Sequence, residues 1–559
     1  ALQPNAINYF SGEEIAGTGV TKNKMSMDWQ STNTMLYTAT ARYDWSNDKH
    51  AVGALVGTSY EHYKYERLAG SREEFPSDAL TDMEAGSTSG AGYTNGAGSS
   101  EYKMLSYFAR VNYTLMDRYL FEVNMRADAS SRFHKDHRWG YFPSFSAGWR
   151  MSEESFMKDI EWINNLKIRA SYGTLGNINN VGNYDYFQNY SSGNHYNFSD
   201  SPVIGIGESK PANETLGWEK VALTDIGLDF DIFNGLLGVT ADYYIKNTSD
   251  ILLGYNVPTE TGITAAPSQN IGKVKNTGFE LALNHRNKIG AVNYSIGANI
   301  ATNKNKITNL GGSDNIIQTS SYIVKYILKK GESIGSFYGF KTDGLYTQAD
   351  IDAGHYYTLS GVVPNAGDIK FVPQRDIEYK QEITDEDRTI LGKDVPDFTY
   401  GVNLSLQYKG FEFSMFGQGI SGTKVAFDVY GVHPFYHGQD SPRKYHLKRW
   451  TEENPNPHAA YPRIYSASSV HTTYNRNFSD YHLFDSDYFR FKTLSLGYTV
   501  PSATVKNWGL QSLKVYVTGE NLFTVRADKK MEDFDPETAG GVIYTLGTIS
   551  VAFGVKISF

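Results

Sequence analysis

The sequence predicts an all-β protein, a membrane-spanning antiparallel β-barrel with short turns at one end and long loops at the other. Three observations predict this fold. Segments of about ten residues in which apolar and polar side chains alternate recur along the chain. The connections between them are alternately tight and very long. Tyrosine (41 residues) and glycine (53) are abundant and aromatic residues reach 14%, as expected for aromatic belts at membrane interfaces and for many turns.

Composition excludes several other classes of protein. Only 40% of the 559 residues are hydrophobic and the mean hydropathy is −0.44, and no apolar run is long enough for a transmembrane helix. Barrel strands are half polar, so they do not raise such averages. The absence of cysteine excludes disulfides and thiolate metal sites. The net charge of −9, without a basic stripe, argues against nucleic acid as a partner.

The first predicted strands are Leu36–Trp45 and Ala51–Tyr63, joined by a tight turn. A Gly/Ser-rich stretch follows, so residues 64–101 are predicted to form a loop. The next hairpin begins near Leu105 and returns at Tyr119, with alternation that places Arg126 on the polar face. On a lipid-facing surface this arginine would cost roughly 2–4 kcal/mol near the bilayer midplane, so the register of the strand is strongly specified.

The middle of the chain contains the clearest hairpin signals. Residues 152–164 have the apolar spacing of a short helix. Two strands then flank Asn234-Gly235, the strongest short signal for a hairpin turn. Two further hairpins follow the same design, one through residues 279–300 and one that turns at Lys409-Gly410.

Three strands are expected to close the chain: Phe489–Val500, Leu513–Val525 and Thr545–Phe559. Along the last of them, apolar residues alternate with small or polar ones and the chain ends on an aromatic residue. The long connections are predicted to lie outside the cell, at about residues 64–101, 177–218, 305–396, 420–486 and 525–544. The alternating apolar residues of the last strand are Val551, Phe553, Val555, Ile557 and Phe559.

The predicted strand number has a consequence for closure of the barrel. We count about fifteen strands, and an odd number cannot close a bacterial single-chain barrel without leaving unpaired edges in hydrocarbon. We therefore expect residues 1–559 to be the C-terminal part of one barrel domain of about 22 strands, the size of plugged transporters. The remaining strands and a plug are expected upstream, in the same protein or in a separate fragment.

Several runs of sequence carry a family resemblance. YGFKTDGLY (338–346), FRFKTLSLGYTVP (489–501), VYVTGENLFT (515–524), Asp535-Pro536-Glu537 and the terminal ISVAFGVKISF together resemble the C-terminal barrel of SusC/RagA-type TonB-dependent transporters. The segment LKIRASYGTLG (166–176) is similar to the same family.

The resemblance implies a function and a set of partners. A protein of this type lies in the outer membrane of a Gram-negative bacterium of the Bacteroidetes and imports oligosaccharides or oligopeptides. It works with a SusD-like surface lipoprotein that acts as a lid, and TonB supplies energy. The sequence shows no plug domain or TonB box, so coupling to TonB is expected through an N-terminal part outside this chain. The last strand resembles the C-terminal signal that outer-membrane assembly machinery reads, formed here by the alternating residues that end in Phe559.

Ligand-binding residues are expected in the long loops. Sugars are held by aromatic faces together with amide and carboxylate groups. Two loops contain this mixture of side chains. For each residue the alternative to ligand binding is that its side chain packs within the loop or against the lid. The candidates that face a ligand or the lid are Tyr184, Tyr186, Asn189, Tyr190, Trp218, Tyr436, Arg443 and Trp450.

Catalytic and metal sites are not expected. Gly331-Glu332-Ser333-Ile334-Gly335 matches the nucleophile elbow of hydrolases, but that motif needs a helix after the serine. Asp385-Glu386-Asp387 lacks the spacing of an EF-hand. The protein is therefore predicted to be no enzyme and to need no cofactor. Two alternatives stay open, namely a passive porin or adhesin barrel without energy coupling and a soluble carbohydrate-binding β-protein.

Overall fold

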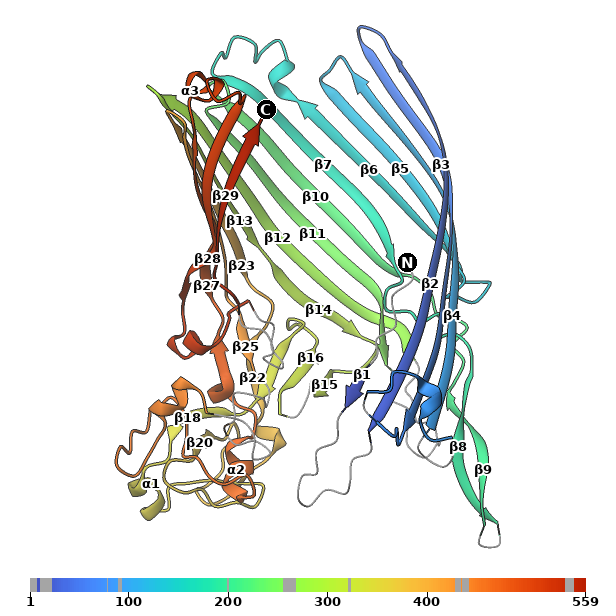
Figure 1. The fold of residues 1–559 in the computed structure, drawn as a ribbon, viewed down its shortest axis with the longest axis vertical. Coiled ribbons are helices and arrows are strands. Elements are labelled where there is room, and N and C mark those ends of the chain that lie inside the picture. Colours follow the sequence, from blue (N-terminus) through green and yellow to red (C-terminus); the bar gives the residue numbers. More distant parts are fainter. Residues whose placement is uncertain are drawn as a thin grey trace. The chain divides into compact units, whose positions relative to one another are not determined.

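A computed structural model describes residues 8–10, 23–77, 79–88, 93–198, 201–254, 268–319, 323–427, 434, 442–537 and 547–559. β-Strands dominate this part of the chain (Figure 1), which confirms the predicted all-β class. Seventeen strands belong to one sheet. They are β1 Asn8–Phe10, β2 Lys24–Ser46, β3 His50–Glu73, β4 Tyr93–Leu115, β5 Tyr119–Ser130, β6 Trp139–Arg150, β7 Ile163–Asn177, β10 Glu219–Ile232, β11 Leu237–Gly254, β12 Ser268–Ile289, β13 Val292–Thr302, β14 Lys304–Leu310, β23 Phe398–Tyr408, β24 Phe411–Ser421, β27 Tyr488–Thr499, β28 Ser512–Arg526 and β29 Ser550–Ser558.

The remaining elements are short and, apart from α3 between β27 and β28, lie in the long connections. The strands are β8 Asn189–Phe198, β9 Ser201–Lys210, β15 Asn315–Thr319, β16 Lys325–Lys329, β17 Ser336–Gly339, β18 Lys341–Leu345, β19 Thr358–Leu359, β20 Ile369–Val372, β21 Glu382–Ile383, β22 Thr389–Lys393, β25 Lys424–Ala426 and β26 Leu483–Asp485. The helices are α1 Gln348–Asp352, α2 Val470–Asn475 and α3 Ser502–Lys506. Within the described ranges no helix is long and apolar enough to cross a membrane.

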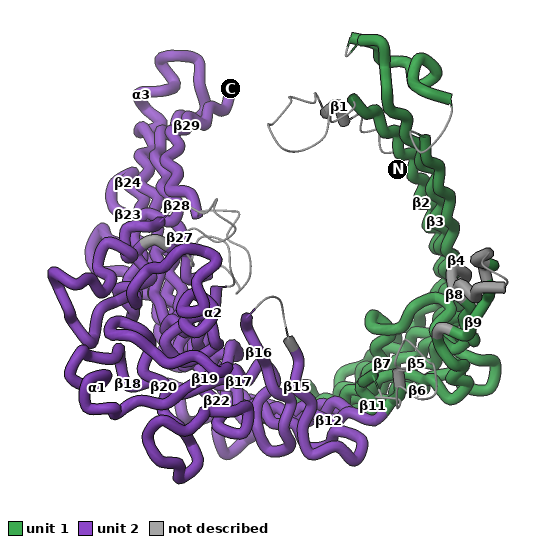
Figure 2. The backbone as a smooth tube through the Cα atoms, turned by 90° about the horizontal axis from the view of Figure 1, so that it is seen from below, with its two compact units in different colours: residues 1–146, 173–221, 250–270 green, residues 147–172, 222–249, 271–559 purple. Residues whose placement is uncertain are grey.

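The chain divides into two compact units, which are described separately (Figure 2). Unit 1 holds residues 1–146, 173–221 and 250–270, and unit 2 holds residues 147–172, 222–249 and 271–559. In unit 1, β2, β3, β4 and β5 pair antiparallel in chain order. In unit 2, β12, β13, β23, β24, β27, β28 and β29 do the same, so strands separated by long connections are direct neighbours.

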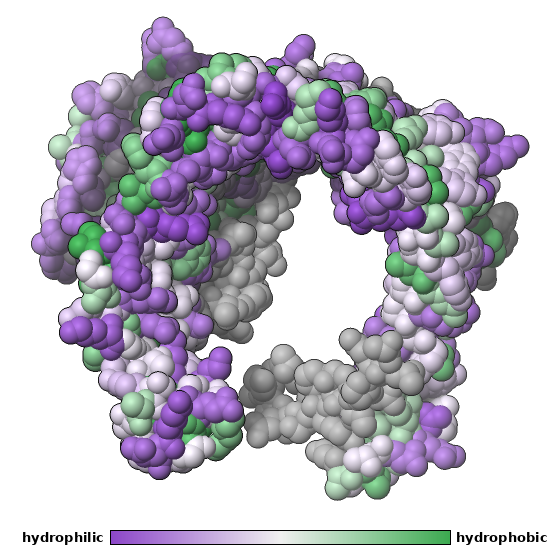
Figure 3. Space-filling model, turned by 90° about the horizontal axis from the view of Figure 1, so that it is seen from above, coloured by the Kyte–Doolittle hydropathy of each residue, from purple (hydrophilic) through white to green (hydrophobic). Residues whose placement is uncertain are grey.

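Tight turns join the strand pairs where the sequence predicts them. Asn234 and Gly235, between β10 and β11, both have positive φ (58° and 78°), as the favoured two-residue hairpin turns require. Lys409 and Gly410, between β23 and β24, repeat this geometry. Figure 3 views the ends of the strands that carry these turns, and hydrophilic residues predominate on the surface it shows.

Two predictions of local structure are wrong. Residues 64–101 are not a single loop, because β3 runs to Glu73 and β4 begins at Tyr93, paired in continuous register. Backbone pairing carries these strands through a Gly/Ser-rich sequence that has no apolar face. The helix expected over residues 152–164 is absent. Its place is taken by a 3-10 turn at Met151–Glu153 and further turns before β7, since an isolated helix of this length is marginal.

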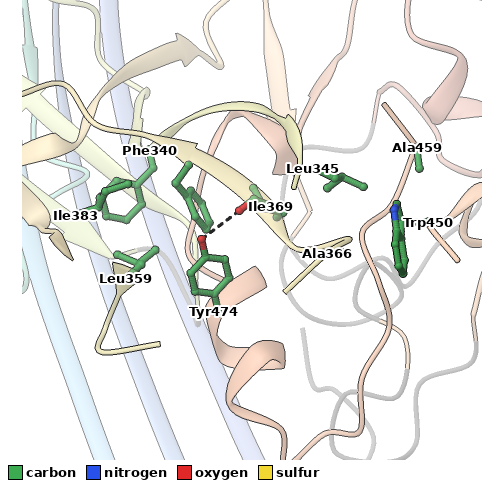
Figure 4. Close-up of a cluster of buried hydrophobic side chains, with 10 residues drawn as sticks. Phe340, Leu345, Leu359, Ala366, Ile369, Ile383, Trp450, Ala459 and Tyr474 are labelled. Carbon is green, nitrogen blue, oxygen red and sulfur yellow. Dashed lines mark hydrogen bonds between the residues drawn. The ribbon is translucent and has the colours of Figure 1, made fainter. Parts of the chain in front are cut away.

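The other long connections are not irregular loops, because they contain strands and hydrophobic clusters of their own. Residues 177–218 include the β8–β9 hairpin. In unit 2, the described residues of 311–397, 423–487 and 527–537 pack together into a body that we call the loop module. One hydrophobic cluster joins its first two connections, because Phe340 and Ile369 belong to the same core as Trp450 and Tyr474 (Figure 4). A second cluster joins the last two, because Phe427 and Phe484 pack with Met531 and Phe534.

Buried polar contacts fix the loop module further. Asp368, which has no exposed surface, accepts a hydrogen bond from Asn475 Nδ2 at 2.9 Å and lies 2.8 Å from His471 Nδ1. Tyr474 donates its hydroxyl to the carbonyl of Ile369 at 3.2 Å. The module therefore has a core of its own, distinct from the wall formed by the long strands.

Candidate functional site

The strands of unit 2 have one apolar and one polar face. On β12, the apolar face carries Phe279, Leu281 and Leu283, and Glu280 and Ala282 lie on the opposite face, because successive side chains of a strand alternate. Phe279 and Leu283 are exposed. An exposed apolar face along a sheet is what a lipid-facing barrel wall requires.

A cavity of about 470 Å³ lies against the polar face, over β11, β12, β13, β23 and β24. Its lining combines the carboxylates of Asp242 and Glu280, the amides of Asn299 and Gln418 and the hydroxyls of Thr240 and Thr399 with the rings of Phe416 and Tyr488. The described lining contains no lysine, arginine or histidine. Such a surface accepts hydrogen bonds from a ligand rich in hydroxyl groups and offers aromatic faces beside them.

One arginine fixes the position of the acidic side of this cavity. Asp242 accepts a hydrogen bond from Arg169 Nη2 at 2.7 Å, and the same guanidinium reaches Asp225 at 3.1 Å and Asp229 at 3.4 Å. Arg169 comes from β7 and its partners from β10 and β11. A side chain at position 227 would collide with the Arg169 guanidinium. Gly227 therefore leaves the space that the Arg169 side chain needs to lie across the strand.

The opposite side of the cavity is connected to the loop module. Gln418 Nε2 donates to Glu537 at 3.3 Å and the Tyr488 hydroxyl donates to the same carboxylate at 3.0 Å. Glu537 is held in turn by Arg490 at 2.8 Å. The lining residues Gln418 and Tyr488 are thereby positioned by the connection between β28 and β29.

A second, larger cavity of about 730 Å³ lies where β13, β14 and β23 meet the loop module. Its lining is polar and carries both signs of charge, including Lys304, Lys306, Asp397 and Asp487. Ser333 of the hydrolase-like motif borders it, but its hydroxyl donates to the carbonyl of Ile334 at 2.9 Å and the strand β17 follows. A strand, rather than the helix that a nucleophile elbow needs, therefore follows the serine.

The structure separates the ligand-facing candidates of unit 1 into two groups. Tyr184, Asn189 and Tyr190 are exposed, and the Tyr184 hydroxyl accepts a hydrogen bond from the backbone N–H of Glu101. Tyr186 and Trp218 are buried in a cluster with Phe133, Phe142, Val181 and Leu216. A ligand can therefore reach Tyr184, Asn189 and Tyr190 on the surface, whereas Tyr186 and Trp218 would have to leave this core.

The candidates of unit 2 belong to the loop module. Trp450 is only 5% exposed and lies in its core, and Arg443 stacks over the ring of Phe534 at 5.2 Å. Tyr436 lies outside the described residues. A ligand role for all these residues stays a prediction. The residues that line the 470 Å³ cavity are not among the candidates predicted from the sequence. The alternation along each strand does indicate that their side chains lie on the polar face.

No group of three or more histidine, aspartate and glutamate side chains in the described ranges is placed to hold a metal ion. Asp387, from the acidic run at 385–387, is fully buried and bonded to Arg375 at 2.7 Å and 3.1 Å. Hydrogen bonds from Arg375 and from backbone amides outweigh the opposing effect of burial and lower the pKa of Asp387 to about 2. This carboxylate is committed to an internal ion pair.

Comparison with known proteins identifies the family. Residues 4–522 match the family described as TonB dependent receptor-like, beta-barrel. The chain belongs to this family. Among curated TonB-dependent receptors, receptor P3 of Formosa agariphila is 30% identical over 520 residues, which cover 91% of this chain and 50% of the relative. SusC of Bacteroides thetaiotaomicron is 30% identical over 451 residues, covering 78% of this chain and 42% of SusC.

Solved structures agree with this TonB-dependent receptor fold. The RagAB peptide transporter superposes with a TM-score of 0.80 at 24% identity, covering 96% of this chain and 56% of the matched chain. At this identity the likeness shows the fold alone. The chain spans about half the length of the curated relatives that it matches.

Proposed function

We propose that this chain forms barrel wall, lumen lining and extracellular loops of a TonB-dependent transporter that imports oligosaccharides. The transporter would lie in the outer membrane of a Gram-negative bacterium and work with a SusD-like surface lipoprotein. Membership of the receptor-barrel family and the likeness to SusC support this role. Asp242, Asn299 and the other lining residues would then face the lumen.

The main observation in favour of an oligosaccharide is the chemistry of the residues that line the 470 Å³ cavity. Its carboxylate, amide and hydroxyl groups offer acceptors to sugar hydroxyls, and Phe416 and Tyr488 lie beside them. A peptide would bring a C-terminal carboxylate, for which the described lining offers no cationic side chain. This balance favours an oligosaccharide over an oligopeptide.

The oligopeptide stays as the second candidate because the 730 Å³ cavity carries both lysine and aspartate side chains. Such a lining suits a ligand with charges of both signs. Lys393 and Asp397 already form an ion pair there at 2.5 Å, so a peptide would compete with an internal partner.

Uptake measurements with lining variants test the proposal. Glu280→Gln and Asn299→Ala remove one acceptor each from positions whose side chains are exposed, so folding should be little affected. Each should reduce uptake of a fluorescent oligosaccharide by about five- to tenfold, which corresponds to about 1 kcal/mol for one hydrogen bond. The control is Glu412→Gln, a wall carboxylate outside the cavity that pairs with Lys514.

Energy coupling is tested in the same cells. A protonophore or loss of TonB should abolish uptake by the unaltered protein. Uptake that persists without the proton gradient would support a passive barrel, and sugar hydrolysis by the pure protein would support a soluble carbohydrate-active protein. Equal loss of oligopeptide and oligosaccharide uptake in Glu280→Gln would contradict the assignment of the substrate class.

A further inference from the structure

The 730 Å³ cavity carries three lysines without an ion-pair partner. Lys304, Lys306 and Lys424 line this cavity, and in the described part of the chain no carboxylate lies within 4 Å of any of them. The fourth lysine of the described lining differs, because Lys393 is paired with Asp397 at 2.5 Å. We call the three unpaired residues the cavity lysines.

The aspartates of the same lining already have hydrogen-bond donors within the chain. Asp487 accepts from the hydroxyl of Ser421 at 2.6 Å and from the backbone N–H of Thr423 at 3.1 Å. Asp485 accepts from the backbone N–H of Asp487 at 3.1 Å, and Glu332 is exposed. The described lining holds four lysines and four carboxylates, but the ammonium groups of the cavity lysines are the donors left without an acceptor. An ammonium group carries three such donors.

The local structure places the cavity lysines where an anion would stabilise them. Lys304 and Lys306 are two residues apart on β14, so their side chains leave the strand on the same face. Lys306 is directly opposite Lys275 of β12, and like charges in such a pair destabilise a sheet. A Cβ at Gly392 would lie 2.6 Å from Cδ of Lys424, so this glycine leaves the space that the lysine stem occupies. An anion bound here would offset the repulsion between these charges.

The two cavities are neighbours along the strands of unit 2. Ala301 and Thr399 line the 470 Å³ cavity, whereas Thr302 and Phe398 line the 730 Å³ cavity. The two pairs are consecutive in the ladder between β13 and β23. Lys304 is three residues beyond Ala301, which is at most about 11 Å along the chain. A short oligosaccharide is therefore long enough to reach both cavities.

We propose that the imported oligosaccharide is acidic, with sugar units in the 470 Å³ cavity and an anionic substituent at the cavity lysines. The substituent is a uronic acid carboxylate or a sulfate ester, since each offers a negative charge and several acceptor oxygens to ammonium groups. The inference rests on the proposed function. An oligopeptide also has a carboxylate, but its ammonium group would meet aspartates that already have partners.

Titration calorimetry of the purified full-length protein tests this inference with matched pairs of ligands. One pair is an oligogalacturonate and its methyl ester, and the other is a sulfated galacto-oligosaccharide and its desulfated form. The acidic member of a pair should bind about tenfold more tightly than the neutral member, and the preference should weaken with salt. The pair that shows the preference distinguishes a carboxylate from a sulfate.

Replacement of the cavity lysines should abolish this preference. Lys304→Gln/Lys306→Gln/Lys424→Gln should lower the affinity for the acidic member about tenfold. The affinity for the neutral member should stay unchanged, which also shows that the variant is folded. The corresponding triple arginine variant should keep the preference, because arginine retains the charge.

The matched control removes three exposed lysines from tight turns, in Lys49→Gln/Lys288→Gln/Lys409→Gln, and should bind both members as the unaltered protein does. Equal affinity for the two members of each pair, or an unchanged preference in the cavity variant, would overturn the inference and leave the proposed function intact. Tighter binding of an oligopeptide that depends on the cavity lysines would also overturn it. Failure of the proposed function gives a different result, because neither acidic nor neutral oligosaccharides would then bind.

Discussion

Arg490 of β27 and Asp535 in the connection between β28 and β29 form a buried, two-pronged ion pair. The guanidinium reaches the carboxylate at 2.7 Å and 3.3 Å, and the two side chains are 5% and 11% exposed. Arg490 also binds Glu537 at 2.8 Å. This pair joins the wall to the loop module and so positions the lining residues Gln418 and Tyr488.

Arg490→Gln should release the connection between β28 and β29. Breaking a buried pair by removing one partner typically costs about 3–5 kcal/mol, because the other charge is left uncompensated. We expect limited proteolysis to cut within residues 527–537 in the variant and not in the unaltered protein. The control is Arg42→Gln, whose pair with Asp44 is exposed. Equal protection of both variants would contradict the role of Arg490.

Trp450→Ala should unfold the loop module and leave the wall intact. Trp450 is buried in the module core, and replacing a core tryptophan by alanine costs about 3–5 kcal/mol. The measurements are protease sensitivity of residues 311–397 and the heat-dependent gel mobility of the barrel. Trp508→Ala, at a tryptophan that is 59% exposed, should change neither. Loss of the mobility shift in Trp450→Ala would show that module and wall fold together.

Acid should loosen the loop module through His482. Burial is the main cause that lowers the pKa of His482 to about 4, and the charge of Lys530 acts in the same direction. A histidine with a lowered pKa in the folded state stabilises that state above its ordinary pKa of about 6.5. This contribution is lost as the pH falls from about 6.5 to about 4.

Hydrogen exchange of residues 470–486 between pH 7 and pH 4, corrected for intrinsic rates, measures this loss. His482→Phe removes the titrating group and should flatten the pH dependence of exchange. His458→Phe is the control, since His458 is not among the buried residues. An unchanged pH profile in His482→Phe would assign the acid sensitivity to another group.

The sequence predicted the wall well and the loop module poorly, for a physical reason. A strand such as β29 shows itself through a period of two within nine residues, from Ser550 to Ser558. The module depends on contacts between residues far apart in the chain, such as Asp368 with His471 and Asn475, and such contacts leave no local pattern. From the sequence, Trp450 is therefore predicted to be an aromatic loop residue that faces a ligand or the lid, and not part of a core.

In the candidate site, too, the sequence predicts what depends on a local pattern and does not predict contacts between distant strands. Alternation places Glu280 and Asn299 on the polar face of their strands, so their direction was predictable. These two residues meet across the β12–β13 hairpin, whereas the rest of the cavity depends on the pairing of β13 with β23 across a connection of nearly a hundred residues. A prediction of ligand-binding residues from residue type alone therefore favours Tyr184 and its neighbours, which are close together in the sequence.

Deletion of Phe559 should impair assembly more than transport. Phe553 and Phe559 are 85% and 81% exposed, and together with Val551, Val555 and Ile557 they form an apolar row on β29. Among the described strands β29 pairs with β28, so little of the fold depends on contacts of Phe559. We expect a lower amount of heat-modifiable barrel in the outer membrane, with uptake per assembled barrel unchanged. Phe559→Tyr keeps an aromatic end and should assemble normally. Normal barrel levels in the deletion, or uptake that falls while barrel levels hold, would contradict a role for this residue in assembly.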